Sequence, residues 1–443
     1  MGYRWLLTLS IFLFHPVFAE VTVDLDDAIK MAIKKNPEIR EQELLIGESQ
    51  GQLEEAQAAQ WPKLETLSYG APMYEITGDA LRSNNNTSEY GYFVKSEGKG
   101  YIPIYTWGKI SNFKKAAQNK IIVDKNKTQE TANEVVYKVK EYYYSYQLAW
   151  TLGKEAKSIL DKLDKIIQKA EEIVKKETGE VTKVDVYKLK VFKAAGLQKY
   201  NKAETGKELA RSALAMQIGL NSAEGFDTTR HLLKEEAAHL QPLETYIKIA
   251  LERRPEMHQL KHGLAARNAL VSAERASLFP MMALGMMYNV ADSNVVKDQQ
   301  SSFAYDPWNS LSGGVALAFK WDIDFLTTKA KVKQLKAKHA ALLAKQEYAV
   351  RGIPMQVKKA YLSLKEQEKN IEYAKEGKKF AQKWFLHSGL GSAFGIGDVK
   401  DVLEGGYSMA LMLNDYYQGI FNYNMSLAEL SNMTGMEVSE LKY

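Results

Sequence analysis

The stretch Leu25-Asp-Asp-Ala-Ile-Lys-Met-Ala-Ile-Lys-Lys-Asn-Pro37-Glu38 decides the fold, because the chain repeats it. About 218 residues later it returns without a gap as Leu243-Glu-Thr-Tyr-Ile-Lys-Ile-Ala-Leu-Glu-Arg-Arg-Pro255-Glu256. Self-similarity over a fixed interval is typical of chains built from repeated structural units. We therefore expect the two halves to form one pseudo-symmetric object.

The duplication spans most of the chain. Trp61-Pro62 returns as Phe279-Pro280 in the same register, and the stretch 179–185, Gly-Glu-Val-Thr-Lys-Val-Asp, is echoed at 395–401 by Gly-Ile-Gly-Asp-Val-Lys-Asp. No Pro/Gly/Ser linker separates autonomous domains. We expect a first repeat over residues 20–240, with a β-hairpin at about 64–107 and a long helical hairpin at about 108–219. A second repeat is expected over 241–443, with the hairpin at about 281–321 and the long helices at about 326–435.

The N-terminus predicts export. Arg4 precedes an apolar run from Trp5 to Phe14, and small residues at Val17 and Ala19 fit a cleavage site, so residues 1–19 are expected to be a signal peptide. The alternative is an uncleaved anchor, but the run is shorter than the roughly 20 residues that span a bilayer.

Composition excludes several classes of protein. The absence of cysteine rules out a disulfide framework, thiol chemistry and an acylated lipoprotein cysteine. The 59 basic and 54 acidic residues give a formal charge of +5, too even to predict nucleic acid as a partner.

Two stretches predict very long helices. Between Ile110 and Val174, and again between Leu326 and Phe385, apolar residues recur at steps of three and four, as in a coiled coil. A helix of roughly 65 to 70 residues extends about 100 Å, which suits a rod that bridges two places. Pro354 lies inside the second stretch, where a proline costs about 3 kcal/mol or kinks the helix.

The period changes to two between the short and the long helices of each half. The clearest case is 311–321, where Leu, Gly, Val, Leu, Phe and Trp alternate with small or polar residues; 282–290 gives its partner. In the first half Leu67, Tyr69, Ala71 and Met73 are the expected apolar positions. Such strands are typical of transmembrane β-barrels, the alternative being a soluble β-sandwich. Four strands cannot close a barrel, so three copies would share one of twelve strands.

In order, spacing and duplication, these motifs resemble the TolC-like outer-membrane efflux proteins across essentially the whole mature chain. Trp107-Gly108-Lys109 stands where that family enters its long helix. The resemblance implies an α-dominated α+β membrane protein, with an internally duplicated long-helix periplasmic tunnel (an α-barrel). Four transmembrane strands per protomer would complete a 12-stranded trimeric β-barrel. It also implies an outer-membrane exit duct for tripartite efflux or type I secretion, working with a periplasmic adaptor (membrane fusion) protein and an inner-membrane transporter.

The resemblance carries functional residues only at the helix tips. Lys400-Asp401-Val-Leu-Glu404-Gly405 resembles the family's Asp-Val-Leu-Asp segment at the periplasmic entrance, with Glu404 in place of the usual Asp. Asp401 and Glu404 share a helix face, so threefold symmetry would stack two acidic rings that attract cations. The alternative is two solvated carboxylates. The expected adaptor contacts are at the turns: Gly179, Thr182, Asp185, Gly395 and Asp398, for which turn chemistry and capping are the alternative.

Enzymatic motifs are absent from the sequence, which has no P-loop, no Gly-x-Ser-x-Gly and no cysteine nucleophile. His258 and His262 have the spacing of two metal ligands on a helix, but no third ligand joins them in sequence, so we expect no metal and no cofactor. The competing function is a periplasmic coiled-coil scaffold or adaptor without a pore, and the alternating strands argue against it.

Overall fold

The structure is a computed structural model that describes residues 21–78, 83–177, 181–223, 225–296, 303, 305–393 and 398–438. The expected signal peptide lies outside these residues and stays a prediction. The chain forms two compact units. The helical unit comprises Met1–Glu41, Thr128–Pro255 and Val350–Tyr443, and the strand unit comprises Gln42–Lys127 and Glu256–Ala349.

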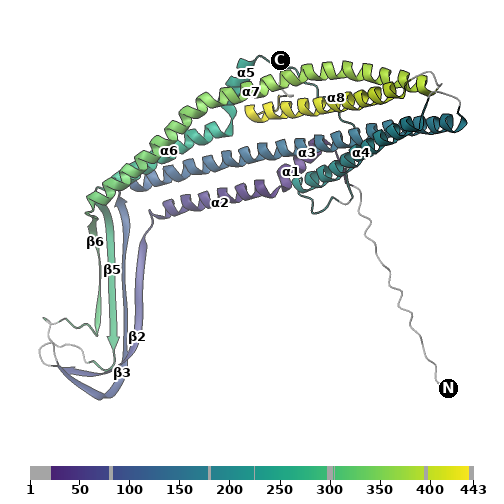
Figure 1. Cartoon of the computed structure of the whole chain (residues 1–443). Coiled ribbons are helices and arrows are strands. Elements are labelled where there is room, and N and C mark those ends of the chain that lie inside the picture. Colours follow the sequence, from purple (N-terminus) through teal and green to yellow (C-terminus); the bar gives the residue numbers. More distant parts are fainter. Residues whose placement is uncertain are drawn as a thin grey trace, which may run out of the picture. The chain divides into compact units, whose positions relative to one another are not determined.

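The elements follow the same order in each half: two short helices, a pair of strands and a pair of long helices (Figure 1). The helices are α1 Leu25–Lys35, α2 Pro37–Ala58, α3 Lys109–Lys176, α4 Lys183–Gln217, α5 Leu243–Arg253, α6 Pro255–Ala276, α7 Phe325–Ala393 and α8 Val399–Thr434. The strands are β1 Val21–Val23, β2 Lys63–Gly78, β3 Ser83–Tyr105, β4 Phe226–Thr228, β5 Met281–Ser293 and β6 Ser310–Lys320.

The repeated stretch forms a helix that stops at an X-Pro step. In the first copy Asp24 caps α1 by accepting a 2.8 Å hydrogen bond from the Asp27 amide, and Asn36 ends it in extended conformation because Pro37 follows. Asn36 is buried, and its side chain donates to the Gln217 carbonyl at 3.0 Å. The first copy of the motif is thus tied to the far end of α4.

The long helices are continuous. α3 has 68 residues and α7 has 69, and Pro354 lies within α7 without ending it. Within the described residues no helix combines the length and the apolarity that crossing a bilayer requires. The expected fold class, a helical chain with two very long helices and four strands between the short and the long helices, is confirmed. β1 and β4 add a short parallel pair that the sequence did not predict.

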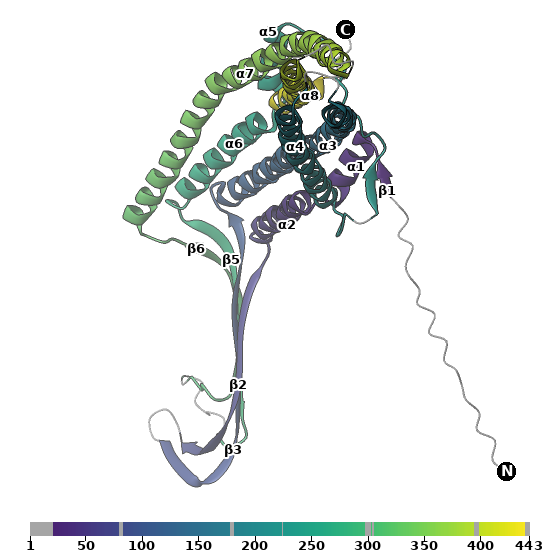
Figure 2. The ribbon, with the colours of Figure 1, turned by 45° about the vertical axis from the view of Figure 1, so that its right-hand side comes forward.

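In the helical unit the long helices run in pairs, α3 with α4 and α7 with α8 (Figure 2). Where the four helices approach their tips they share one apolar core of leucine, isoleucine, valine and phenylalanine side chains, including Leu163, Leu189, Phe385 and Val402. Of the apolar positions that form the coiled-coil pattern, Leu163 and Phe385 are buried in this core, whereas Leu326 near the start of α7 is 82% exposed.

The strand unit contains one antiparallel sheet in the order β2-β3-β5-β6. Cross-strand register puts Glu65, Lys95, Glu97 and Lys99 on one face, with a Lys95–Glu97 ion pair of 2.8 Å and a Lys99–Glu65 pair of 3.5 Å. The other face carries exposed apolar side chains, among them Leu311, Val315, Leu317 and Phe319 of β6. One face is therefore charged and the other apolar.

One detail of the strand prediction is wrong. Leu67 lies opposite Glu97 and Tyr69 opposite Lys95, so both side chains lie on the charged face. Partners directly opposite each other in a ladder point to the same side of the sheet, and this register is not readable from the period of one strand alone.

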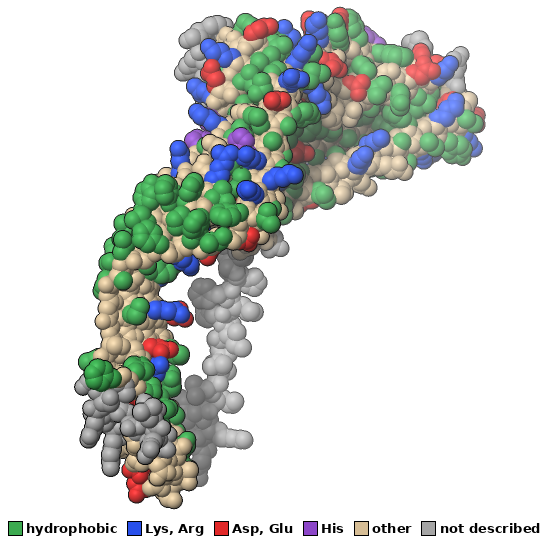
Figure 3. Space-filling model, turned by 90° about the vertical axis from the view of Figure 1, so that its left-hand side faces the viewer, with side chains coloured by type: hydrophobic (Ala, Val, Ile, Leu, Met, Phe, Trp, Pro, Cys, Tyr) green, Lys and Arg blue, Asp and Glu red, His purple; other side chains and the backbone are tan. Residues whose placement is uncertain are grey.

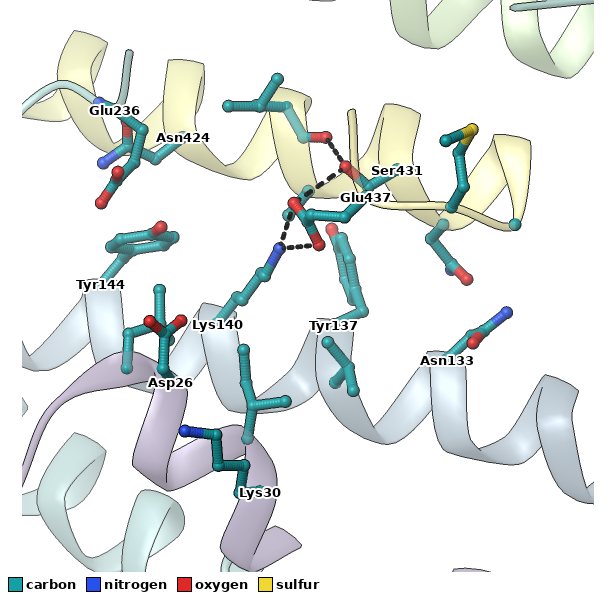
Figure 4. A pocket seen from close by; sticks show the side chains of 18 residues that line it. Asp26, Lys30, Asn133, Tyr137, Lys140, Tyr144, Glu236, Asn424, Ser431 and Glu437 are labelled. Atoms are coloured by element: carbon teal, nitrogen blue, oxygen red, sulfur yellow. Dashed lines mark hydrogen bonds and ion pairs between the residues drawn. The ribbon is translucent and has the colours of Figure 1, made fainter. Parts of the chain in front are cut away.

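A cavity of about 700 Å³ lies in the helical unit among α1, α3 and α8 (Figure 4). At its centre Lys140 of α3 donates to both carboxylate oxygens of Glu437, at 2.8 and 2.7 Å. Glu437 follows α8, which ends at Gly435 in the left-handed conformation that glycine favours. The ion pair therefore fastens the end of the described chain to the middle of α3.

Candidate functional site

The first helix tip is organised by a capping box at the start of α4. The Thr182 hydroxyl accepts a 3.3 Å hydrogen bond from the Asp185 amide, and the Asp185 carboxylate accepts from the Thr182 amide at 3.1 Å. The Thr182 hydroxyl also donates to that carboxylate at 2.6 Å. These hydrogen bonds from Thr182 are the main cause of a lowered pKa at Asp185, to which Lys188 at 3.1 Å also contributes.

The second tip has a simpler cap. α8 begins at Val399, and Asp398 caps it by accepting a 2.9 Å hydrogen bond from the Lys400 amide. The predicted turn residues Gly179 and Gly395 lie outside the described residues. Of the other three, Thr182 and Asp185 contact each other at the start of α4, and Asp398 lies at the start of α8. Thr182, Asp185 and Asp398 therefore cap the first turns of α4 and α8.

The acidic pair lies on the exposed side of α8. Val399 and Val402 point into the shared core, whereas Asp401 and Glu404 are exposed. Lys400 lies 3.9 Å from Glu404, and both side chains are at least half exposed, so this contact contributes little stability. The carboxylates are free to face water, ions or another chain.

Two glycines that directly follow Glu404 set how closely α8 approaches its neighbours, and the sequence reasoning did not find them. A Cβ on Gly405 would lie 3.1 Å from the Phe385 Cα of α7, and one on Gly406 would lie 3.1 Å from the rings of Phe192 and Phe385. The signal was in the sequence, since paired glycines inside a helical pattern often mark close packing.

A second set of contacts fixes α8 further from the tip. Lys378 of α7 lies 3.6 Å from the Tyr416 ring centroid and 5.3 Å from that of Tyr417. Tyr417 donates to Glu155 of α3 at 3.3 Å, and burial, followed by this carboxylate, raises its pKa to about 12. Burial also lowers the pKa of Lys378. These contacts join α3, α7 and α8, so the helix that carries Asp401 and Glu404 is packed against two neighbours.

Of His258 and His262, which have the spacing of two metal ligands, His262 forms a hydrogen bond within the chain. Nδ1 of His262 lies 2.9 Å from the Asn119 side-chain oxygen, and burial, with Lys261 and His258 nearby, lowers the pKa of His262. In the part of the chain that the structure describes, no three His, Cys, Asp or Glu side chains converge as a metal site would need.

Solved structures of outer-membrane channels share this fold. CusC covers 95% of this chain at 15% identity with a TM-score of 0.78, and this chain covers 96% of CusC. The CmeC outer membrane channel of Campylobacter jejuni has a TM-score of 0.75 at 15% identity, and the match covers 95% of this chain and 87% of CmeC. The outer membrane protein VceC of Vibrio cholerae has a TM-score of 0.74 at 13% identity, and the match covers 94% of this chain and 96% of VceC. No curated protein sequence matches the chain.

The fold is thus that of an outer-membrane channel, shared at low identity over nearly the whole length. Residues 246–404 match the family model described as Outer membrane efflux protein. The chain therefore carries an outer membrane efflux protein domain, and its resemblance to the TolC-like channels is confirmed. The match to this domain indicates an outer-membrane location and the function of an efflux channel.

Proposed function

We propose that three copies of this chain form the exit duct of a tripartite efflux or type I secretion system. The duct would work with a periplasmic adaptor and an inner-membrane transporter. Residues 20–240 and 241–443 would be the two structural repeats, and residues 1–19 the cleaved signal peptide. In this assembly the chain performs no chemistry of its own.

The two-faced sheet is the observation that carries the proposal. Its apolar face suits lipid and its charged face suits a water-filled lumen, while β2 and β6 are edges without a partner strand in the described chain. Unpaired edges cost several kcal/mol per backbone group in hydrocarbon, and pairing β6 of one copy with β2 of the next removes that cost. Three sheets of four strands then close one barrel.

The gate of this duct is formed, in the proposal, by Asp401 and Glu404. Their exposure on α8, opposite the buried Val402, supports it, because threefold symmetry turns each carboxylate into a ring. Rings of carboxylates select and retain cations. The adaptor would contact the tips at Thr182, Asp185 and Asp398, together with Gly179 and Gly395.

Single-channel conductance in a planar bilayer tests this function. We expect small cation-preferring pores that millimolar divalent ions block from the helical end, and loss of that block in Asp401→Ala plus Glu404→Ala. A control with Glu366→Ala plus Glu376→Ala removes the same charge from exposed positions of α7 and should keep the block. Unchanged block in the first variant would move the gate elsewhere, and a folded trimer without pores would refute the duct.

A further inference from the structure

A basic cleft of about 500 Å³ lies in the strand unit, where α6 ends and α7 begins. Its cations are Arg275 from α6 and three lysines from α7, and its apolar lining includes Phe279 and Val332. The lysines are Lys329, Lys333 and Lys336, whose spacing puts them on one helix face. The duct function proposed above makes no use of this cleft.

The cleft carries positive charge without compensation. All four cationic side chains are exposed, and no aspartate or glutamate is among the residues that line the cleft. Like charges close together on a helix repel one another, so a bound anion would stabilise the arrangement. The combination of four cations with an apolar lining suits an amphiphile whose charged group is an anion.

Aromatic side chains indicate the level of the cleft relative to the membrane. Phe279, at its edge, stacks on Trp107 at 4.8 Å, and the Trp107 indole donates to the Pro280 carbonyl at 2.9 Å. Trp321, which follows β6, and Phe325, the first residue of α7, have ring centroids 6.0 Å apart. Aromatic residues at the ends of membrane strands lie at headgroup level, so the cleft lies there too. In Figure 3 a group of Lys and Arg side chains borders a hydrophobic band.

The first repeat has the same elements but carries different side chains at three of the positions that correspond to the four cations. At the interval of 218 residues that relates the short helices, Gln57 corresponds to Arg275. At the interval of 216 residues that relates the long helices, Phe113 corresponds to Lys329 and Ala117 to Lys333. Ala117 is buried, and Lys120, which corresponds to Lys336, pairs with Asp124. The cluster of four cations is therefore not a general consequence of the architecture, since the first repeat carries Gln57, Phe113 and Ala117 at three of the four positions.

We propose that this cleft binds an anionic phospholipid from the periplasmic leaflet of the outer membrane. The lipid phosphate contacts Arg275 and the three lysines, and the beginning of the acyl chains covers Phe279 and Val332. Basic pockets beside membrane-spanning elements bind anionic headgroups in this way. The inference rests on the outer-membrane location and is independent of the acidic gate.

Native mass spectrometry of the purified full-length protein, delipidated in detergent and titrated with cardiolipin, tests the proposal. We expect retained cardiolipin on the wild type and much weaker retention of zwitterionic phosphatidylcholine. Lys329→Gln, Lys333→Gln and Lys336→Gln together should weaken cardiolipin binding on the order of 100-fold, at about fivefold per lysine. The matched control Lys358→Gln, Lys359→Gln and Lys369→Gln changes the same charge at exposed positions further along α7 and should bind as the wild type does.

Each alternative occupant gives a different result. Equal cardiolipin retention by the triple variant and the wild type would overturn the proposal, and so would equally strong competition by inorganic phosphate, which would indicate a free-anion site. Loss of the trimer with unchanged lipid per chain would assign the lysines to a contact with a second copy. If the triple variant does not fold, Arg275→Gln alone provides the test. Pore conductance of the same preparations separates failure of this inference from failure of the duct.

Discussion

The ion pair between Lys140 and Glu437 gives a prediction in which the two partners are not equivalent. The Lys140 side chain is 9% exposed and that of Glu437 is 31% exposed. Glu437→Gln leaves a nearly buried ammonium without its counter-ion, whereas Lys140→Met keeps the apolar stem and leaves a carboxylate that can turn toward water. The first change should therefore cost more stability than the second.

The magnitudes follow from these exposures. Removing one partner of a fully buried pair costs about 3–5 kcal/mol, and an exposed pair contributes about 0–1 kcal/mol. Because this pair is intermediate, we expect about 2–3 kcal/mol for Glu437→Gln and about 1 kcal/mol for Lys140→Met. The double variant should cost about as much as Lys140→Met alone, since it buries no uncompensated charge.

Thermal unfolding of the purified protein, followed by intrinsic tryptophan fluorescence at one fixed scan rate, measures the effect. For a unit of this size 1 kcal/mol shifts the midpoint by about 2 °C, so Glu437→Gln should lower it by about 5 °C and the other two variants by about 2 °C. Equal shifts for the two single variants, adding in the double variant, would refute the reasoning from burial.

Three further outcomes are expected. Thr182→Ala should cost about 1 kcal/mol and speed amide exchange in the first turn of α4. Because folding lowers the pKa of Asp185, the ionised carboxylate contributes its full stabilisation above the ordinary pKa of 3.8 and loses it as the pH falls below that value. The stabilities of the variant and the wild type should therefore converge at low pH. Gly405→Val should cost about 1–3 kcal/mol and alter conductance, whereas Gly51→Ala, with open space around it, should stabilise α2 by up to about 1 kcal/mol in thermal unfolding. Asn424→Leu should lower the unfolding midpoint by about 2–6 °C, because Asn424 accepts from the Glu236 amide and donates to the Lys234 carbonyl.

Much of the fold could be predicted because the two periods in the sequence are strong. The steps of three and four predict α3 and α7, and the alternation near Val315 predicts the two-faced sheet. The exposed positions of Asp401 and Glu404 also follow from the sequence, since Val399 and Val402 alternate with them and must be buried.

Other features depend on partners distant in sequence. The side of the sheet on which Leu67 lies is set by its register with β3, and the tight approach at Gly405 is set by the backbone of Phe385. The Lys140–Glu437 pair joins residues that are 297 positions apart in the sequence. No local pattern predicts such contacts, because the pattern of apolar residues shows which face of a helix or strand is buried but not which distant segment packs against that face.

The unpaired edges of the sheet have a genetic consequence. In the proposed assembly each copy supplies β2 to one seam and β6 to another, so one chain with a disrupted β2 or β6 would open one seam and with it the whole ring. When normal and defective copies are made in one cell and mix at random, intact ducts should fall with the cube of the normal fraction. An edge-strand mutation should therefore be dominant over the wild-type allele, whereas a mutation that prevents export should be recessive.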